Sequence, residues 1–185
     1  MVNSVQMNRG IVTLVTLMIA LSLSACGGDE GSDTTSPSEW ADSMCSDLSE
    51  WKSSVASVAA SLGGSDLSQE QVQDVVNEVA ASTEMLVGNL QDLGRPDTEA
   101  GQEAEDAVNQ LADELQTGIG EMERAAAGVS GGTDASQAAS SITATATTMS
   151  DEVSSAFTSL EQLEPQGELT SALEQSEACN DLSSS

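Results

Sequence analysis

The side chains that most often carry out acid–base or nucleophilic chemistry are scarce in this sequence. It contains no histidine and no tyrosine, and its three cysteines are Cys26, Cys45 and Cys179. Histidine is the only side chain whose ordinary pKa lies near neutrality, so the usual general base is missing. Serines are many, but Lys52 is the only lysine that could act as a partner base. An enzyme is therefore the less favoured interpretation.

Carboxylates are the abundant reactive groups, with 31 Asp and Glu residues against four Lys and Arg. Paired carboxylates can hydrolyse glycosides, but among so many acids such pairs arise by chance. The Cys and His spacing of a zinc site and the D-x-D-x-D-G pattern of a calcium loop are both absent. Asp29, Glu30 and Asp33 could attract calcium loosely, although a solvated acidic linker is the simpler interpretation. No catalytic residue, metal site or cofactor is predicted.

Cys26 follows a segment with the organisation of a secretory signal. Residues 1–25 contain no acid and one base, Arg9, and residues 11–23 are apolar apart from Thr and Ser. A basic region, an apolar core and small residues before a cleavage point are typical of exported proteins. A membrane-spanning helix needs about 20 apolar residues, and here glycines and acids follow Cys26 at once. Met7 is an alternative start that would leave Arg9 near the amino terminus.

The residues Leu23, Ser24, Ala25 and Cys26 resemble the lipobox of bacterial lipoproteins. The resemblance implies cleavage before Cys26, a diacylglycerol on its thiol and acylation of the new amino group. One acyl chain binds a membrane only marginally, whereas two or three anchor a protein stably. We therefore expect a lipid-anchored protein on the extracytoplasmic face of the cell membrane. The composition, with a Trp and a Cys opening the first helix and a Cys near the end, is similar to that of uncharacterised helical-bundle lipoproteins of high-GC Gram-positive bacteria.

Charge restricts the partners of this protein. Cleavage would leave 160 residues (185 − 25), which carry 31 acids and three bases, a net charge of −28 (3 − 31). Such a surface repels nucleic acid and anionic lipid headgroups, so we exclude DNA and RNA as partners. Acidic chains can be disordered, but here 38% of all residues are hydrophobic and they fall into regular stripes. The length suffices for one folded domain with a core.

Apolar residues recur at steps of three and four through four long segments, each bounded by helix start and stop signals. Trp40 and Trp51 lie on one such stripe and are predicted core residues rather than the walls of a ligand slot. The Thr-rich stretch 142–148 also fits a strand, but the period on either side favours a helix. A short fifth helix is predicted after Pro165, between residues 168 and 182. The four long helices are expected to start at Ser36, at Ser68, near Asp97 or Thr98, and near Thr133 or Asp134. Gly63, Gly94, Gly128 and Pro165 mark where they stop.

Four long helices with short connections predict an all-α, up-down four-helix bundle. Export leaves Cys45 and Cys179 as an even pair in a compartment where disulfides persist, although two free buried thiols are the alternative. They would lie at similar heights, about 13 Å along the first helix and about 16 Å along the last. A Cys45–Cys179 disulfide that staples the fifth helix to the first is therefore predicted. The expected organisation is a signal peptide (1–25), a lipidated cysteine with a flexible acidic tether (26–35), the bundle (36–182) and a disordered tail (183–185).

Glu99, Glu103 and Asp106 recur at steps of four and three, on one outward face of the third predicted helix. This acidic face has two interpretations. It is either a docking surface for a cationic partner or a solvated face that keeps the protein soluble, and the second is the more common.

Two functions remain open. The first is a tethered, non-enzymatic interaction module that binds an envelope protein or polymer. The second is a carrier or sensor that holds an apolar ligand inside the bundle, beside the Ala- and Thr-rich fourth helix. A sealed core favours the first function, and an apolar cavity of roughly several hundred Å³ favours the second.

Overall fold

The computed structural model describes residues 34–62, 67–131 and 133–184, and helices account for most of them. The prediction of an all-α helical bundle is confirmed. None of the helices in this part of the chain is both long enough and apolar enough to cross a membrane. The elements in chain order are β1 (Thr34–Thr35), α1 (Pro37–Ser61), α2 (Gln69–Asp92), β2 (Arg95–Pro96), α3 (Gly101–Ser130), α4 (Ala135–Leu163), α5 (Glu168–Gln175) and α6 (Glu177–Ser184).

The helix starts follow local capping chemistry. Ser36 caps α1, where its hydroxyl accepts from the Glu39 amide. In α2 the Ser68 hydroxyl accepts from the Gln71 amide at 3.2 Å, and the Gln71 side chain accepts from the Ser68 amide at 2.9 Å. These reciprocal bonds satisfy two amides that a helix end leaves without partners. Asp134 caps α4 with a single bond, in which its carboxylate accepts from the Ser136 amide at 2.8 Å. All three starts agree with the sequence prediction.

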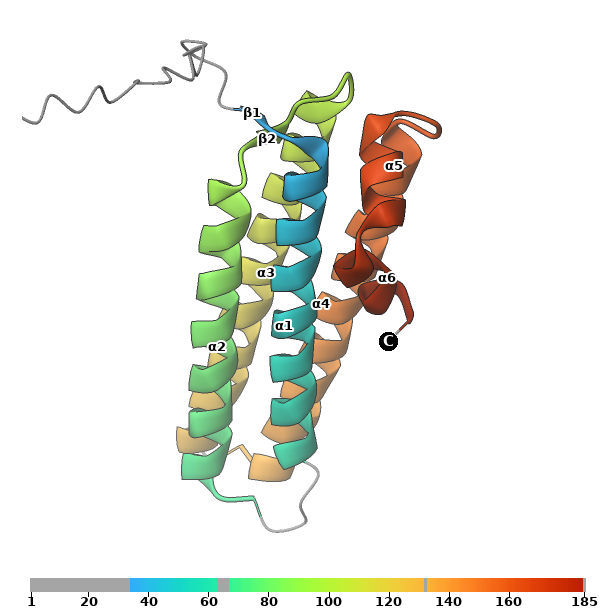
Figure 1. Ribbon diagram of the computed structural model, residues 1–185. Coiled ribbons are helices and arrows are strands. Elements are labelled where there is room, and N and C mark those ends of the chain that lie inside the picture. Colours follow the sequence, from blue (N-terminus) through green and yellow to red (C-terminus); the bar gives the residue numbers. More distant parts are fainter. Residues whose placement is uncertain (1–33, 63–66, 132, 185) are drawn as a thin grey trace, which may run out of the picture. The chain divides into compact units, whose positions relative to one another are not determined.

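The four long helices lie side by side, and each runs opposite to the one before it (Figure 1). Helix α3 packs against α2 and α4, while α1 packs against α2 and against the two short C-terminal helices. The chain turns after α4, and α5 and α6 run back beside α1 (Figure 1). The predicted up-down order is therefore present, with one seam of the bundle partly filled by the C-terminal segment.

The core is a single apolar cluster that runs through the bundle. Trp40 and Trp51 are both buried in it, as predicted. Each indole N–H finds an acceptor: Trp40 donates to the Gly94 carbonyl at 3.0 Å, and Trp51 donates to the Thr83 hydroxyl at 2.9 Å. The Thr-rich stretch of α4 is helical. The hydroxyls of Thr143, Thr147 and Thr148 donate to carbonyls one turn earlier in the same helix, which satisfies them without a strand partner.

Two predicted boundaries are wrong, namely the end of the flexible tether and the start of α3. Thr34 and Thr35, assigned to the flexible tether, pair in parallel with Arg95 and Pro96. The Asp97 amide then donates to the Thr35 carbonyl at 2.9 Å. This pairing holds the chain extended, so α3 begins at Gly101 rather than at residue 97 or 98.

The single fifth helix of the prediction is two helices. Helix α5 ends where Ser176 takes an extended conformation, and α6 starts directly after it. The buried Ser176 hydroxyl accepts from the Cys179 amide and so caps the new helix. Helix α6 continues to Ser184, so Ser183 and Ser184 are not the disordered tail that was expected.

Cys45 of α1 and Cys179 of α6 form the predicted disulfide, with their Cα atoms 4.9 Å apart. Both side chains are buried. The bond joins positions 134 residues apart and attaches α6 to α1. Lys52 adds a polar contact at the same interface, since its Nζ lies 3.5 Å from the Leu182 carbonyl.

Candidate functional site

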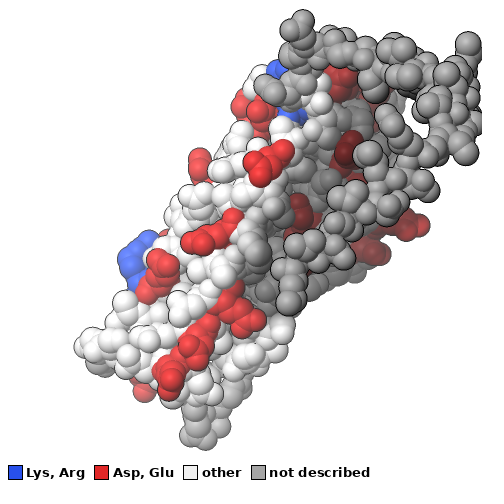
Figure 2. All heavy atoms as spheres, turned by 60° about the vertical axis from the view of Figure 1, so that its left-hand side comes forward, with Lys and Arg blue, Asp and Glu red and all other residues white. Residues whose placement is uncertain are grey.

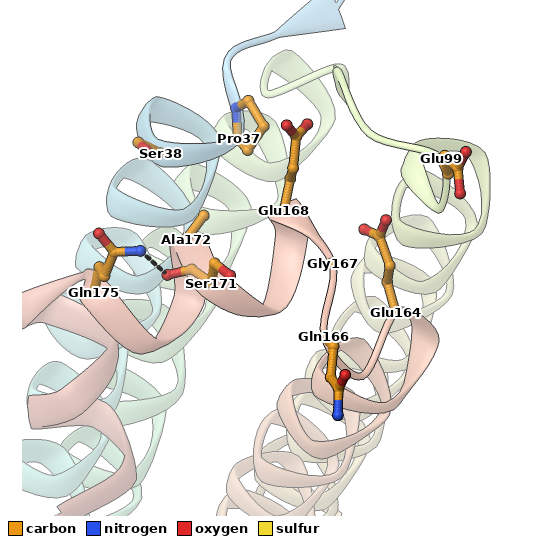
Figure 3. Close-up of a pocket in the computed structure, with 10 residues that line it drawn as sticks. All are labelled: Pro37, Ser38, Glu99, Glu164, Gln166, Gly167, Glu168, Ser171, Ala172 and Gln175. Atoms are coloured by element: carbon orange, nitrogen blue, oxygen red, sulfur yellow. Dashed lines mark hydrogen bonds between the residues drawn. The ribbon is translucent and has the colours of Figure 1, made fainter.

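A cleft of about 670 Å³ opens at the end of the bundle where α1 begins. We call it the end cleft. Four chain segments meet there: the start of α1, the turn before α3, the turn from α4 to α5, and α5 itself (Figure 3). Its walls are made of Pro37, Ser38, Glu99, Glu164, Gln166, Gly167, Glu168, Ser171, Ala172 and Gln175.

Three carboxylates define the chemistry of the end cleft. Glu99 comes from the turn before α3, Glu164 from the end of α4, and Glu168 from the first turn of α5. Glu99 and Glu168 are exposed, and all three side chains border the same opening (Figure 3). Among the residues that the structure describes, no lysine or arginine lines the cleft. Carboxylates accept hydrogen bonds and attract cations, so this arrangement suits an amine or a guanidinium group.

Glu164 is held in place by its own turn. One carboxylate oxygen, Oε2, accepts from the Leu169 amide at 3.3 Å, which caps the start of α5. Its backbone carbonyl accepts from the Thr170 hydroxyl at 2.8 Å. The carboxylate also occupies the space where a side chain on Gly167 would begin, so only glycine leaves it undisturbed. Glu164 therefore supplies a fixed charge, while Glu99 and Glu168 are free to adjust to a ligand.

The predicted acidic face is not one continuous helical surface. Glu99 precedes α3, whereas Glu103 and Asp106 lie in its first two turns. All three are exposed. Asp106 accepts from the Gln102 side chain at 3.5 Å, and Gln102 in turn accepts from Arg95 at 3.3 Å. The structure thus places Glu99 in the end cleft and leaves the other two beside it on α3, because the β1–β2 pairing delays the start of the helix.

Four further clefts lie along the helix seams. One of about 160 Å³ lies between α1 and α2, one of about 380 Å³ between α2 and α3, and two of about 320 and 300 Å³ between α3 and α4. Each is open to solvent, and each has at least two carboxylates in its walls. The cleft between α1 and α2 is lined by Asp47 and Glu50, and the one between α2 and α3 by Glu84 and Glu123. Both clefts between α3 and α4 are lined by Glu114 and Glu152.

Glu152 occupies the seam between α3 and α4. One of its carboxylate oxygens is buried and has no hydrogen-bond partner in the part of the chain that the structure describes. Burial raises the pKa of Glu152 above its ordinary value, and the neighbouring charges of Glu114 and Glu121 raise it further. Within residues 34–62, 67–131 and 133–184, no group of three or more Asp, Glu, Cys or His side chains is arranged to hold a metal ion.

The lipobox residues Leu23, Ser24 and Ala25 and the lipidation site Cys26 lie outside the described residues, as does the signal peptide. Cleavage, acylation and the cell-membrane location therefore remain predictions from the sequence.

Comparisons with protein-family models, with curated proteins and with solved structures give no match for this chain.

Sequence reasoning missed Glu164 and Glu168 as site residues. The signal that could have found them is the break Pro165-Gln166-Gly167. It places one acid at the end of a helix and the other at the start of the next. The sequence alone did not show that Glu99 would lie near both.

Proposed function

We propose that this protein is a membrane-anchored, extracytoplasmic interaction module without enzymatic activity, and that its end cleft holds a cationic segment of an envelope protein or polymer. The observation that carries the proposal is the meeting of Glu99, Glu164 and Glu168 in one cleft, whose described walls contain no basic side chain. A net charge of −27 over the whole chain supports the choice of a cationic partner, because such a field attracts cations and speeds their association.

The proposed anchor would keep the end cleft near the membrane. Pro37 lines the cleft and follows Cys26 by 11 residues (37 − 26). A fully extended chain spans at most about 3.3–3.6 Å per residue, so this connection would reach roughly 36–40 Å. A lipid on Cys26 would therefore confine the cleft to the zone next to the membrane, where a partner anchored in the same membrane is also concentrated.

Non-enzymatic binding is supported by the residues that are present. The chain has no histidine or tyrosine, and Cys45 and Cys179 are joined to each other. The alternative function, a carrier for an apolar ligand, gains no support from the clefts described above, since each has at least two carboxylates in its walls.

The anchor is tested by Cys26→Ser. We expect this variant to move from the detergent phase to the aqueous phase on phase partitioning, while its helical circular dichroism signal is unchanged. Retention of the variant in the membrane would contradict the lipoprotein assignment.

The docking site is tested by capture of partners from crosslinked cell envelopes. The double variant Glu99→Gln, Glu168→Gln removes two charges from the end cleft, and we expect it to lose the partner. The matched control is Glu70→Gln, Glu78→Gln, which removes two exposed charges of α2 that line none of the described clefts. Equal capture by both double variants would show that the end cleft is not the docking site.

A further inference from the structure

The seam between α2 and α3 differs from the end cleft because its floor is apolar. We call it the α2–α3 groove. It has a volume of about 380 Å³, and its floor contains Val87 and Ile119, which are 6% and 9% exposed. Glu84 of α2 and Glu123 of α3 are exposed and also line the groove. An apolar floor bordered by carboxylates matches a partner that has apolar and cationic groups side by side.

Two glycines in the helices of this groove are not explained by packing inside the protein. Glycine is among the least favourable residues in the interior of a helix. Of the described atoms, none lies within 4 Å of a Cβ built on Gly88, and only the Arg124 side chain, at 3.7 Å, lies within that distance of a Cβ built on Gly120. Gly118 is different, because a Cβ there would lie 2.7 Å from the Met149 side chain. Gly120 lines the groove, and the bare backbone of a glycine lets another molecule approach closely.

The charge of α2 and α3 favours a cationic occupant. Arg124 is the only base on these two helices, whereas α2 carries five acids and α3 carries seven. Figure 2 brings the α2 side of the bundle forward and shows acidic side chains spread along it, with basic ones in few places. The acids concerned are Glu70, Asp74, Glu78, Glu84 and Asp92 on α2, and Glu103, Glu105, Asp106, Asp113, Glu114, Glu121 and Glu123 on α3.

We infer that the α2–α3 groove is a second docking surface, which binds an amphipathic cationic helix of a partner protein. The apolar side chains of that helix enter the groove over Val87, Ile119 and Gly120, and its lysines or arginines pair with Glu84 and Glu123. Laying an amphipathic helix into an apolar groove is a common mode of peptide recognition. The inference rests on the proposed function in one respect, namely that the partner is cationic, but it concerns a different site.

The probe is a synthetic peptide of about 18 residues, with leucines at helical spacing on one face and lysines on the other. The full chain is used in non-ionic detergent, with ¹³C label on the isoleucine methyl groups. Among the described residues the isoleucines are Ile119, which lines the groove, and Ile142, which lies in the core of α4. We expect the peptide to shift the Ile119 methyl signal and to leave the Ile142 signal in place.

Two pairs of variants test the groove itself. Gly120→Leu fills it without altering charge and should weaken peptide binding about tenfold, while Ala144→Leu adds the same side chain on the exposed face of α4 and should leave binding unchanged. Glu84→Gln, Glu123→Gln should weaken binding more than Glu78→Gln, Glu121→Gln, which removes two charges from other faces of the same helices.

The outcomes separate this inference from the proposed function. The peptide could bind without shifting the Ile119 methyl signal and lose its binding in the double variant Glu99→Gln, Glu168→Gln. That result would overturn docking in the α2–α3 groove and support docking in the end cleft. Equal binding of a peptide with the same composition in scrambled order would overturn the requirement for an amphipathic helix. Absence of peptide binding would also overturn the proposal that the α2–α3 groove is a docking surface. Capture of partners from cell envelopes tests the end cleft independently.

Discussion

The indole N–H of Trp51 donates to the Thr83 hydroxyl at 2.9 Å and so joins α1 to α2 inside the bundle. Both side chains are almost fully buried, at 2% and 1% exposure. A buried N–H needs an acceptor, because its hydrogen bonds to water are lost on folding. Thr83 lies on the apolar stripe of α2, and its hydroxyl provides that acceptor.

Replacing Thr83 with valine keeps the shape of the side chain and removes the acceptor. We expect the free energy of unfolding to fall by about 1–3 kcal/mol, because the Trp51 N–H is left buried without a partner. Urea denaturation measures the change. Thr147→Val is the matched control, since Thr147 is exposed on α4 and bonds within its own helix. A Thr83→Val variant as stable as the parent would show that the bond contributes little.

Reducing the Cys45–Cys179 disulfide should loosen α5 and α6 before the rest of the bundle. The bond spans 134 residues. The chain-entropy model gives about 4.7 kcal/mol for a 100-residue loop and therefore about 5 kcal/mol as an upper figure for this one. Hydrogen exchange should therefore rise first after Pro165, and the melting temperature should fall. Non-reducing peptide mapping checks the pairing, and two free thiols in exported protein would disprove it. Uniform exchange along the whole chain would contradict the local role.

Glu152 makes stability depend on pH in a definite direction. Its pKa is raised in the folded protein, by burial and by Glu114 and Glu121. Between the pKa of Glu152 in the unfolded state and its higher pKa in the folded state, the folded protein binds a proton that the unfolded chain has lost. The stabilising contribution of protonated Glu152 is therefore lost as pH rises through the folded-state pKa. Glu152→Gln should raise the melting temperature at neutral pH and flatten this part of the profile.

The control for Glu152 is Asp151→Asn, which removes one charge from the exposed neighbouring position of α4. Melting curves from pH 4 to pH 8, by circular dichroism, compare the two variants with the parent. The same profile for both variants would mean that total charge matters, and not the seam between α3 and α4.

Gly118 and Gly120 should respond in opposite ways to alanine. Alanine is about 1 kcal/mol more favourable than glycine inside a helix. Gly120→Ala has only a 3.7 Å contact with Arg124 and should gain that amount, whereas Gly118→Ala places a Cβ 2.7 Å from the Met149 side chain. Overpacking of this kind costs about 1–3 kcal/mol. Thermal unfolding should rank the Gly120 variant at least about 1 kcal/mol above the Gly118 variant, and the reverse order would refute the packing argument.

Helix starts were predictable where the decisive contacts are local. Ser36, Ser68 and Asp134 each bond to an amide two or three residues ahead, so the sequence contains both partners. The start of α3 was missed because its determinant is remote: the Asp97 amide bonds to the Thr35 carbonyl. The division of the C-terminal helix at Ser176 was also missed. The capping bond from the Cys179 amide to the Ser176 hydroxyl is equally local, but Ser176 also fits the stripe of one continuous helix, so the periodicity favoured a single helix.

The amino-acid pattern was enough to predict the all-α class, the four long apolar stripes and their up-down order. It favoured a disulfide between Cys45 and Cys179 over two free thiols, and the structure contains that bond. The sequence also carries the prediction of a lipid anchor at Cys26, outside the described residues. Apolar periodicity suffices for the helices and their order because it records which face of each helix avoids water. The tertiary structure alone decided that Glu99 meets Glu164 and Glu168, and that the α2–α3 groove remains open. Both depend on how separate segments pack against each other at a seam or a bundle end, and no spacing along one helix records that contact.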